Sequence, residues 1–134
     1  MGKINSRAKG CVGERELSHE IKRVMGWMGI QTEANRTAQH CGDSGDSDVL
    51  IHQLPQVFAE VKRVERLNVQ EAMDKAAKQA EVAGKIPVLF HRRNRHPWLV
   101  TLKLDQLPAF AEMLETAKCI AEEEREIESP NDST

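Results

Sequence analysis

The fold of this chain is decided by two short apolar stretches, Asp48-Val-Leu-Ile51 and Val57-Phe-Ala-Glu-Val-Lys-Arg-Val64. β-Branched residues are frequent in both stretches and Leu54-Pro55 lies between them, which predicts two consecutive strands joined as an antiparallel hairpin. Because side chains alternate between the two faces of a strand, Glu60 and Lys62 point the same way. A carboxylate and an ammonium group therefore lie side by side on an otherwise apolar strand.

Two carboxylates are predicted to converge on this hairpin. Asp48 opens the first strand within reach of Glu60 on the second, and buried polar groups are costly unless something requires them. Paired carboxylates suit a hard divalent cation such as Mg²⁺, with Mn²⁺ as the alternative, because such ions take oxygen ligands and bind phosphate. Lys62 could orient an attacking water or hold the phosphate. The pattern predicts a metal-dependent nuclease.

Length and composition indicate one domain, which we place at residues 1–128. The 134 residues suffice for a single core, and 40% hydrophobic and 30% charged residues are ordinary for a globular protein. No stretch approaches the roughly 20 apolar residues of a membrane helix, and the first residues lack the apolar segment of a secretion signal. We therefore expect a cytoplasmic protein without a membrane partner. Three cysteines without CxxC spacing indicate reduced thiols rather than a zinc finger or a disulfide framework.

Charge is distributed unevenly along the chain. Residues 1–103 contain 17 Lys and Arg against 12 Asp and Glu, a net +5, whereas residues 104–134 contain 2 against 9, a net −7. The overall charge of −2 therefore does not exclude a nucleic-acid surface, which depends on where the basic residues cluster. Residues 1–9 are expected to form a basic flexible arm, either a DNA contact or an ordinary solvated terminus. Residues 129–134 are expected to form a disordered acidic tail.

A first amphipathic helix is predicted from about Val12 to Met28, because apolar residues recur there at helical spacing. These residues are Leu17, Ile21, Val24 and Met28. At about 100° per residue Glu14 lies close to this stripe and points toward the sheet, whereas Glu16 lies on the other side and is expected to be solvated. The inward Glu14 either binds metal or complements the helix dipole.

A further strand is predicted within Ile30–Ala38, with Arg36 near its end as a candidate DNA contact. Residues 40–48 are dense in turn residues. Their aspartates suggest a calcium loop, but the glutamate that an EF-hand requires at its twelfth position is missing. Ser44 could instead donate a hydrogen bond to a DNA backbone; the alternative is a plain connector.

Asn68 marks the start of the next helix, since its side chain can cap the first turn and Glu71 follows three residues later. This helix should run to about Ala83 and end at Gly84, with a thin inner face of small residues. Gln70, in the first turn, is placed to face the site; the alternative is a solvated glutamine.

Two more strands are predicted at Ile86–His91 and Trp98–Leu102, and the segment between them is the most basic in the chain. Its three arginines could grip phosphates in a bidentate manner, or the segment could be a solvated turn. These arginines are Arg92, Arg93 and Arg95. A last helix is predicted from Asp105 to about Glu126, and its acidic end would repel DNA.

The order of these elements and of their polar residues resembles the PD-(D/E)XK nuclease superfamily. More closely, it resembles the archaeal-type Holliday junction resolvases and their phage-borne relatives. The residues that carry the resemblance are Gly13-Glu-Arg-Glu-Leu17, Ser44-Gly45, Asp48-Val-Leu-Ile51 and Glu60-Val-Lys62. Glu-x-Lys alone occurs by chance in many strands, so the signal is the joint order and spacing over residues 10–102.

The resemblance implies a restriction-endonuclease-like fold of the α/β class. Its expected order is α-β-β-β-α-β-β-α, with a central mixed five-stranded sheet flanked by helices. The resemblance also implies a Mg²⁺-dependent endonuclease that hydrolyses phosphodiester bonds in branched DNA, usually as a homodimer. The expected setting is the cytoplasm of a bacterium or of a phage-infected cell.

The resemblance also assigns roles by matching position. The implied metal ligands, all catalytic, are Glu14, Asp48 and Glu60. Lys62 would be the fourth catalytic residue and assist the water, Ser44 would lie in the substrate-contacting loop, and Gln70 would support the site. The chain departs from the family in having Ser47 rather than proline before the first strand acid, and in a shorter, more acidic serine-glycine loop. The arginines at 92–95 could take over the phosphate grip of that loop.

Two other functions stay open on the sequence. The first is a repair or restriction-like nuclease of the same fold that acts on linear or single-stranded DNA, although no added recognition domain is evident. The second is a DNA-binding protein that does not cut. The complete acidic set together with Lys62 disfavours that second hypothesis, because a binding module has no use for carboxylates that face phosphates.

Overall fold

The computed structural model describes residues 6–37 and 48–128 of the chain. The elements, in chain order, are helix α1 (Ser6–Trp27), strands β1 (Ala34–Arg36), β2 (Val49–Ile51) and β3 (Val57–Arg63), helix α2 (Val69–Ala83), strands β4 (Ile86–Arg92) and β5 (Leu99–Thr101), a short 3₁₀ turn η1 (Leu104–Gln106) and helix α3 (Leu107–Glu128). The predicted order of helix, three strands, helix, two strands and helix is confirmed.

The five strands form one mixed sheet in the order β1-β2-β3-β4-β5. All neighbouring strands are antiparallel except β3 and β4, which are parallel and connected by α2. The predicted hairpin of β2 and β3 and the predicted α/β class with a mixed five-stranded sheet are both confirmed. In the parallel pair Glu60 lies opposite Leu89 and Lys62 opposite His91.

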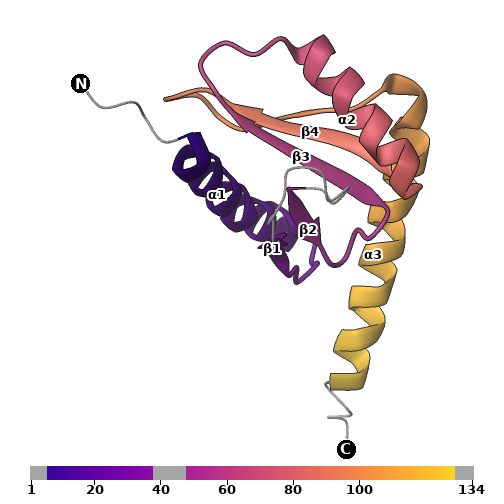
Figure 1. Cartoon of the computed structure of the whole chain (residues 1–134). Helices are drawn as coiled ribbons and strands as arrows, with labels where there is room; N and C mark the ends of the chain where they lie inside the picture. Colours follow the sequence, from indigo (N-terminus) through magenta and orange to yellow (C-terminus); the bar gives the residue numbers. More distant parts are fainter. Residues whose placement is uncertain (1–5, 38–47, 129–134) are drawn as a thin grey trace, which may run out of the picture.

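The helices cover opposite faces of the sheet (Figure 1). Helix α1 packs across β1 and β3, while α2 lies over β4 on the other face. The larger core lies on the α1 side, and its buried residues include Leu17, Ile21, Met25, Val57, Ala59, Val88 and Phe90. On the α2 side a smaller cluster is formed by Ala72, Met73 and Leu89. The strand alternation thus sends Val57 and Ala59 toward α1 and leaves Glu60 on the side of α2.

The first helix differs from its prediction in two respects. It begins at Ser6 rather than Val12, so residues 6–9 belong to a helix and not to a flexible arm. Its buried stripe continues from Ile21 to Met25, which is 5% exposed, whereas Val24 is 40% exposed. The reason is that burial follows the i, i+4 row of the helix surface. Residues 1–5 and the predicted tail 129–134 lie outside the described residues.

The ends of α2 follow the sequence signals. The Asn68 side-chain oxygen accepts a hydrogen bond from the Glu71 N–H at 3.0 Å, and Gly84 adopts the left-handed conformation with φ of 68°. Helix α3 begins two residues later than expected, after η1. Figure 1 shows its C-terminal half projecting away from the sheet. No helix in the described ranges is long and apolar enough to cross a membrane.

Replacing Asn68 by Ala should lower the free energy of unfolding by about 1 kcal/mol, because the Glu71 N–H loses its acceptor. The Asn68→Asp variant keeps an acceptor at the same place and should stay close to wild type. Denaturant unfolding of the three proteins measures both differences. Equal losses in the Ala and Asp variants would show that the cap does not stabilise α2.

Candidate metal and nucleic-acid site

Asp48 is hydrogen-bonded to the edge of β3 through both its backbone and its side chain. Its N–H donates to the Ala59 carbonyl oxygen at 3.0 Å, and its Oδ2 accepts from the Val61 N–H at 2.9 Å. The carboxylate therefore occupies a position on the β3 edge that a continued β2 would otherwise fill. This position brings the Asp48 carboxylate next to Glu60, which lies between Ala59 and Val61 in β3.

Glu60 is hydrogen-bonded to Asp48, and its pKa is raised from an ordinary 4.5 to about 8. Burial is the largest cause, followed by the hydrogen bond to Asp48 and by the negative charge of that carboxylate. The positive charges of Lys62 and Lys75 act in the opposite direction but do not offset these effects. Two carboxyl groups thus share one place in the fold, as the alternation in β3 and the position of Asp48 predicted.

Lys62 lies two residues after Glu60 on the same face of β3. It is partly buried, and its neighbour in the parallel register is His91. The His91 ring nitrogen Nε2 is 2.8 Å from the Thr101 hydroxyl, and burial lowers the pKa of His91. Lys62 is therefore paired in register with a histidine whose neutral form is favoured.

Glu14 points inward from α1, as predicted, and is only 7% exposed. Its Oε2 accepts from Arg36 Nε at 2.7 Å, so the candidate DNA contact on β1 is an ion-pair partner of a candidate metal ligand. Burial nevertheless raises the pKa of Glu14, with a smaller raising effect from the charge of Asp48 and opposing effects from Arg36. Glu14 is therefore close enough to Asp48 for the charge of that carboxylate to act on it.

Asp48 and Glu60 are the side chains that could hold a divalent cation, which takes carboxylate oxygens as ligands and would compensate the like charges that contribute to the raised pKa of Glu60. Within residues 6–37 and 48–128, no three His, Cys, Asp or Glu side chains are grouped closely enough to hold a metal ion. The third carboxylate, Glu14, is held by Arg36 instead.

The remaining predicted site residues lie apart from this centre. Ser44 is outside the described residues. Gln70 is exposed in the first turn of α2, where its Nε2 donates to Asp74 at 2.9 Å. Arg93 and Arg95 are exposed near the turn between β4 and β5, and Arg95 has a positive φ of 64°.

Arg92 and Glu16 differ from the other residues of their segments. Arg92 is half-buried rather than free at the hairpin tip, since its Nη1 donates to Glu16 at 2.7 Å. Glu16 was expected to be solvated, and that expectation is wrong, because it also accepts from Arg63 at 3.0 Å. Arg63 was not singled out from the sequence. The available signal was the strand alternation, which places it on the α1 face with Val61.

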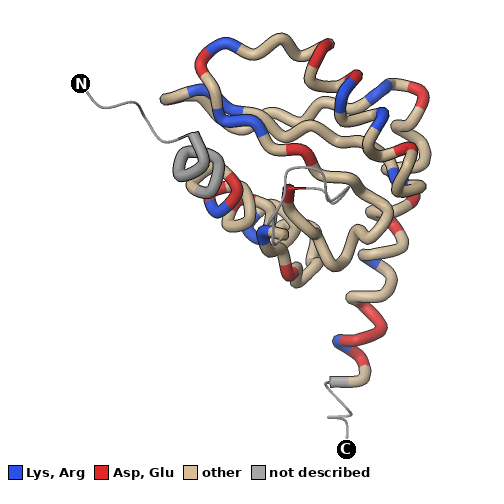
Figure 2. The backbone as a smooth tube through the Cα atoms, viewed as in Figure 1, with Lys and Arg blue, Asp and Glu red and all other residues tan. Residues whose placement is uncertain are grey.

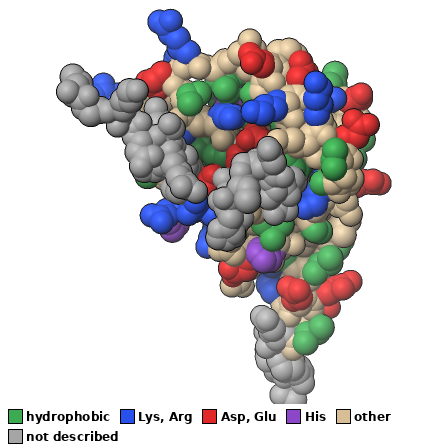
Figure 3. Space-filling model, in the orientation of Figure 1, with side chains coloured by type: hydrophobic (Ala, Val, Ile, Leu, Met, Phe, Trp, Pro, Cys, Tyr) green, Lys and Arg blue, Asp and Glu red, His purple; other side chains and the backbone are tan. Residues whose placement is uncertain are grey.

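Basic residues gather on one side of the molecule. Figure 2 shows Lys and Arg gathered around the end of β3 and along the start of the β4–β5 hairpin, whereas the projecting end of α3 is largely acidic. On the face seen in Figure 3, acidic side chains near the middle lie beneath a row of Lys and Arg side chains. A negatively charged backbone could therefore approach the acids along positively charged neighbours.

No family model matches the chain, and no curated protein matches it either. Among solved structures it is similar to Hjc, a Holliday junction resolvase from the archaeal hyperthermophile Archaeoglobus fulgidus, with 14% identity and a TM-score of 0.44. The similarity covers 65% of this chain and 73% of that one. At this level of similarity, any activity has to be inferred from the side chains of this chain itself.

The raised pKa of Glu60 predicts how stability depends on pH in the absence of divalent metal. The folded state binds the Glu60 proton more tightly than the unfolded state, so the free energy of unfolding should fall as pH rises from about 4.5 to about 8. The Glu60→Gln variant lacks this titration. The difference between wild type and variant isolates it from His91, whose lowered pKa acts with the opposite sign.

Denaturant unfolding of both proteins in EDTA across this pH range measures that difference. Wild type should lose stability relative to Glu60→Gln as pH rises. A difference that stays constant with pH would contradict the placement of Glu60 against Asp48.

Proposed function

We propose that this protein is a metal-dependent endonuclease that hydrolyses phosphodiester bonds in DNA. The observation that carries the proposal is the contact of Asp48 with Glu60 beside Lys62 on a buried strand. Buried carboxylates in contact destabilise an apolar sheet unless they serve a ligand. A phosphodiester with a divalent cation is a ligand that would use both the acids and the ammonium group.

Asp48 and Glu60 would hold a divalent cation, Mg²⁺ or Mn²⁺, and Glu14 would become a third ligand on exchanging Arg36 for the metal. Such a cation stabilises negative charge on a phosphoryl group in the transition state and lowers the pKa of a bound water. In the absence of the cation, Arg36 supplies the positive charge that Glu14 requires. Arg36 would then be a contact for the DNA backbone.

Lys62 would contact the substrate from the same face as Glu60. Its ammonium group can donate to a non-bridging phosphate oxygen or to the attacking water. The rigid parallel pairing of β3 with β4 fixes where that group lies. Catalysis by positioning depends on such rigidity, since small displacements of a catalytic group cost large factors in rate.

For the substrate we propose branched DNA, with a four-way junction as the preferred form and a homodimer as the active species. The support is the joint order of the sequence motifs around Glu14, Asp48 and Glu60. A nuclease acting on linear or single-stranded DNA, or a protein that binds DNA without cutting it, is the alternative. The candidate contacts outside the acids are Ser44, Arg36, Gln70, Arg92, Arg93 and Arg95.

The test is a gel assay with end-labelled four-way junction, fork and linear duplex, each with Mg²⁺ or EDTA. Glu60→Ala should abolish cleavage and leave DNA binding largely intact, because basic residues rather than carboxylates supply the affinity. The matched control is Glu81→Ala, which removes an exposed acid from the last turn of α2 and should cut like wild type.

Paired symmetric nicks in the junction alone would support a resolvase. Cleavage of every substrate would indicate a general nuclease of the same fold, and binding without metal-dependent cleavage would leave a DNA-binding protein. Cleavage by Glu60→Ala at the wild-type rate would refute the assignment of the acidic pair.

A further inference from the structure

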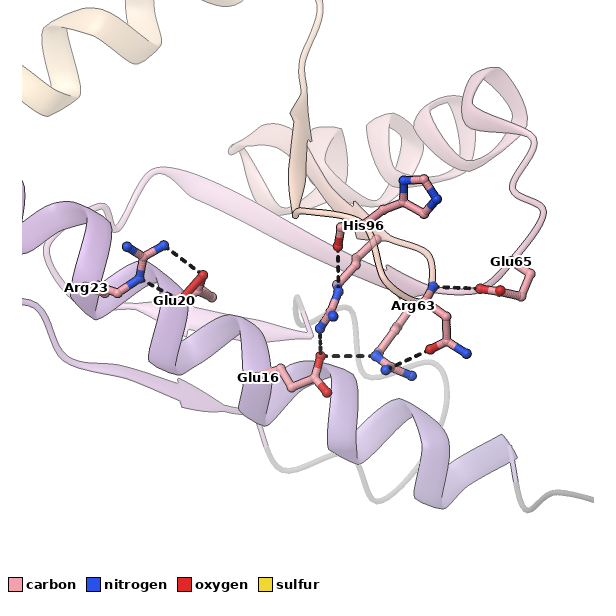
Figure 4. A network of polar contacts seen from close by, with 8 residues as sticks. Glu16, Glu20, Arg23, Arg63, Glu65 and His96 are labelled. Carbon is pink, nitrogen blue, oxygen red and sulfur yellow. Dashed lines mark hydrogen bonds and ion pairs between the residues drawn. The ribbon is translucent and has the colours of Figure 1, made fainter.

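One carboxylate oxygen accepts hydrogen bonds from two arginines that come from different strands. Glu16 Oε1, on α1, accepts from Arg63 Nε at 3.0 Å and from Arg92 Nη1 at 2.7 Å (Figure 4). The three side chains are 31%, 22% and 26% exposed respectively. This arrangement is half-buried, so solvent screens it less than an ion pair on the surface.

The sheet itself places the two arginines side by side. Arg63 ends β3 and Arg92 ends β4, and they are partners in the parallel register. Gly13 allows α1 to approach them, because a Cβ at that position would be only 3.1 Å from the Arg63 Cβ. The neighbour of Gly13 is Glu14, and the neighbour of Arg63 is Lys62. The arginine pair therefore lies at the end of β3 next to Lys62 in the chain, but on the α1 face of the sheet, whereas Glu60 and Lys62 face α2.

The two guanidinium groups of the arginine pair are in direct contact with one acid, and the charge of Glu20 also interacts with Arg92. Glu16 contributes one negative charge to two guanidinium groups. The remaining hydrogen bonds are to neutral groups: Arg63 Nη2 donates to the Asn94 side chain at 3.1 Å, and Arg92 Nε donates to the His96 carbonyl oxygen at 2.8 Å. Arg63 Nη1 and Arg92 Nη2 have no hydrogen-bond acceptor among the described residues. Two directed donors on positively charged groups are what a further anion needs.

Asn94, which accepts a hydrogen bond from Arg63, is also fixed through its backbone. The Asn94 backbone N–H donates to Glu65 Oε2 at 2.7 Å, and this hydrogen bond connects the turn after β4 to the segment after β3 (Figure 4). The guanidinium groups are thus ordered before any ligand arrives, and binding loses less side-chain entropy than it would at free arginines.

Another ion pair on α1 lacks these properties. Arg23 pairs one to one with Glu20 on its own helix and has a side chain 53% exposed. It has no strand partner, and its guanidinium lies over the Trp27 ring at 4.7 Å. A pair of this kind is an ordinary surface contact of small energy. Arg23 therefore provides a control with the same change of charge.

We propose that Arg63 and Arg92 form a preorganised site for a DNA backbone phosphate at the α1 side of the end of β3, with Glu16 as the residue that positions both. This inference rests on the proposed function in taking the ligand to be DNA. The planar guanidinium groups would each present a free edge to the phosphate oxygens, and arginine suits this geometry better than lysine. Phosphate contacts of this type fix the register of the backbone without reading its sequence.

The test is the salt dependence of DNA binding in EDTA, where binding is measured without cleavage. Arg63→Gln and Arg92→Gln should each weaken binding by roughly five- to ten-fold near physiological salt, and each should reduce the slope of log affinity against log salt by part of the roughly 0.9 that one phosphate contact contributes. The double Gln variant should lose that whole contribution. Arg23→Gln removes the same charge and should leave the slope unchanged.

The double Lys variant, Arg63→Lys with Arg92→Lys, should recover the slope, because it restores both charges. Circular dichroism and the unfolding midpoint of each variant identify any loss of fold, and the single Gln variants carry the test where the double one does not fold. A slope unchanged in the folded Gln variants, or one as low in the Lys variant as in the Gln variant, would overturn the inference. So would an absence of DNA binding by the wild type. Wild-type binding without cleavage would instead overturn only the proposed nuclease activity.

Discussion

The attachment of Asp48 to the edge of β3 is the constraint on which the rest of the site depends. Two hydrogen bonds, one to the Ala59 carbonyl oxygen and one from the Val61 N–H, hold its carboxylate in line with the sheet. Because both are bonds to backbone groups of β3, Asp48 cannot move without β3, and its distance from Glu60 is set by the strand rather than by flexible side chains. The acidic pair is therefore a property of strand pairing.

The acidic pair lowers the stability of the fold. Strand β3 is buried along its first half and packs on both faces of the sheet, yet it carries Glu60 and Lys62 in its second half. The raised pKa of Glu60 reflects this cost, because burial and the neighbouring Asp48 disfavour the charged form of the carboxyl group. Apolar packing by α1 and α2 has to offset that cost, which is consistent with a core that continues on both sides of β3.

The parts of the structure that depend on local pattern could be predicted from the sequence. Alternation in β3 placed Glu60 with Lys62, helical spacing turned Glu14 inward, and Asn68 with Gly84 bounded α2. The partners of Glu16 could not be predicted, because they depend on the angle at which α1 crosses the sheet and on which strands lie beneath it. Helical periodicity distinguishes an apolar face from a polar one, but it does not identify a polar residue at the margin that meets an arginine from another strand.

The acidic end of α3 projects from the domain, whereas the basic hairpin end of β4 and β5 lies on another side (Figure 2). With a net +5 before residue 104 and −7 after it, the chain is a strong electric dipole although its total charge is small. In the field of a polyanion such a molecule experiences a torque that turns its basic side forward before any contact forms. Orientation during approach, rather than overall attraction, is then what the uneven charge contributes to association.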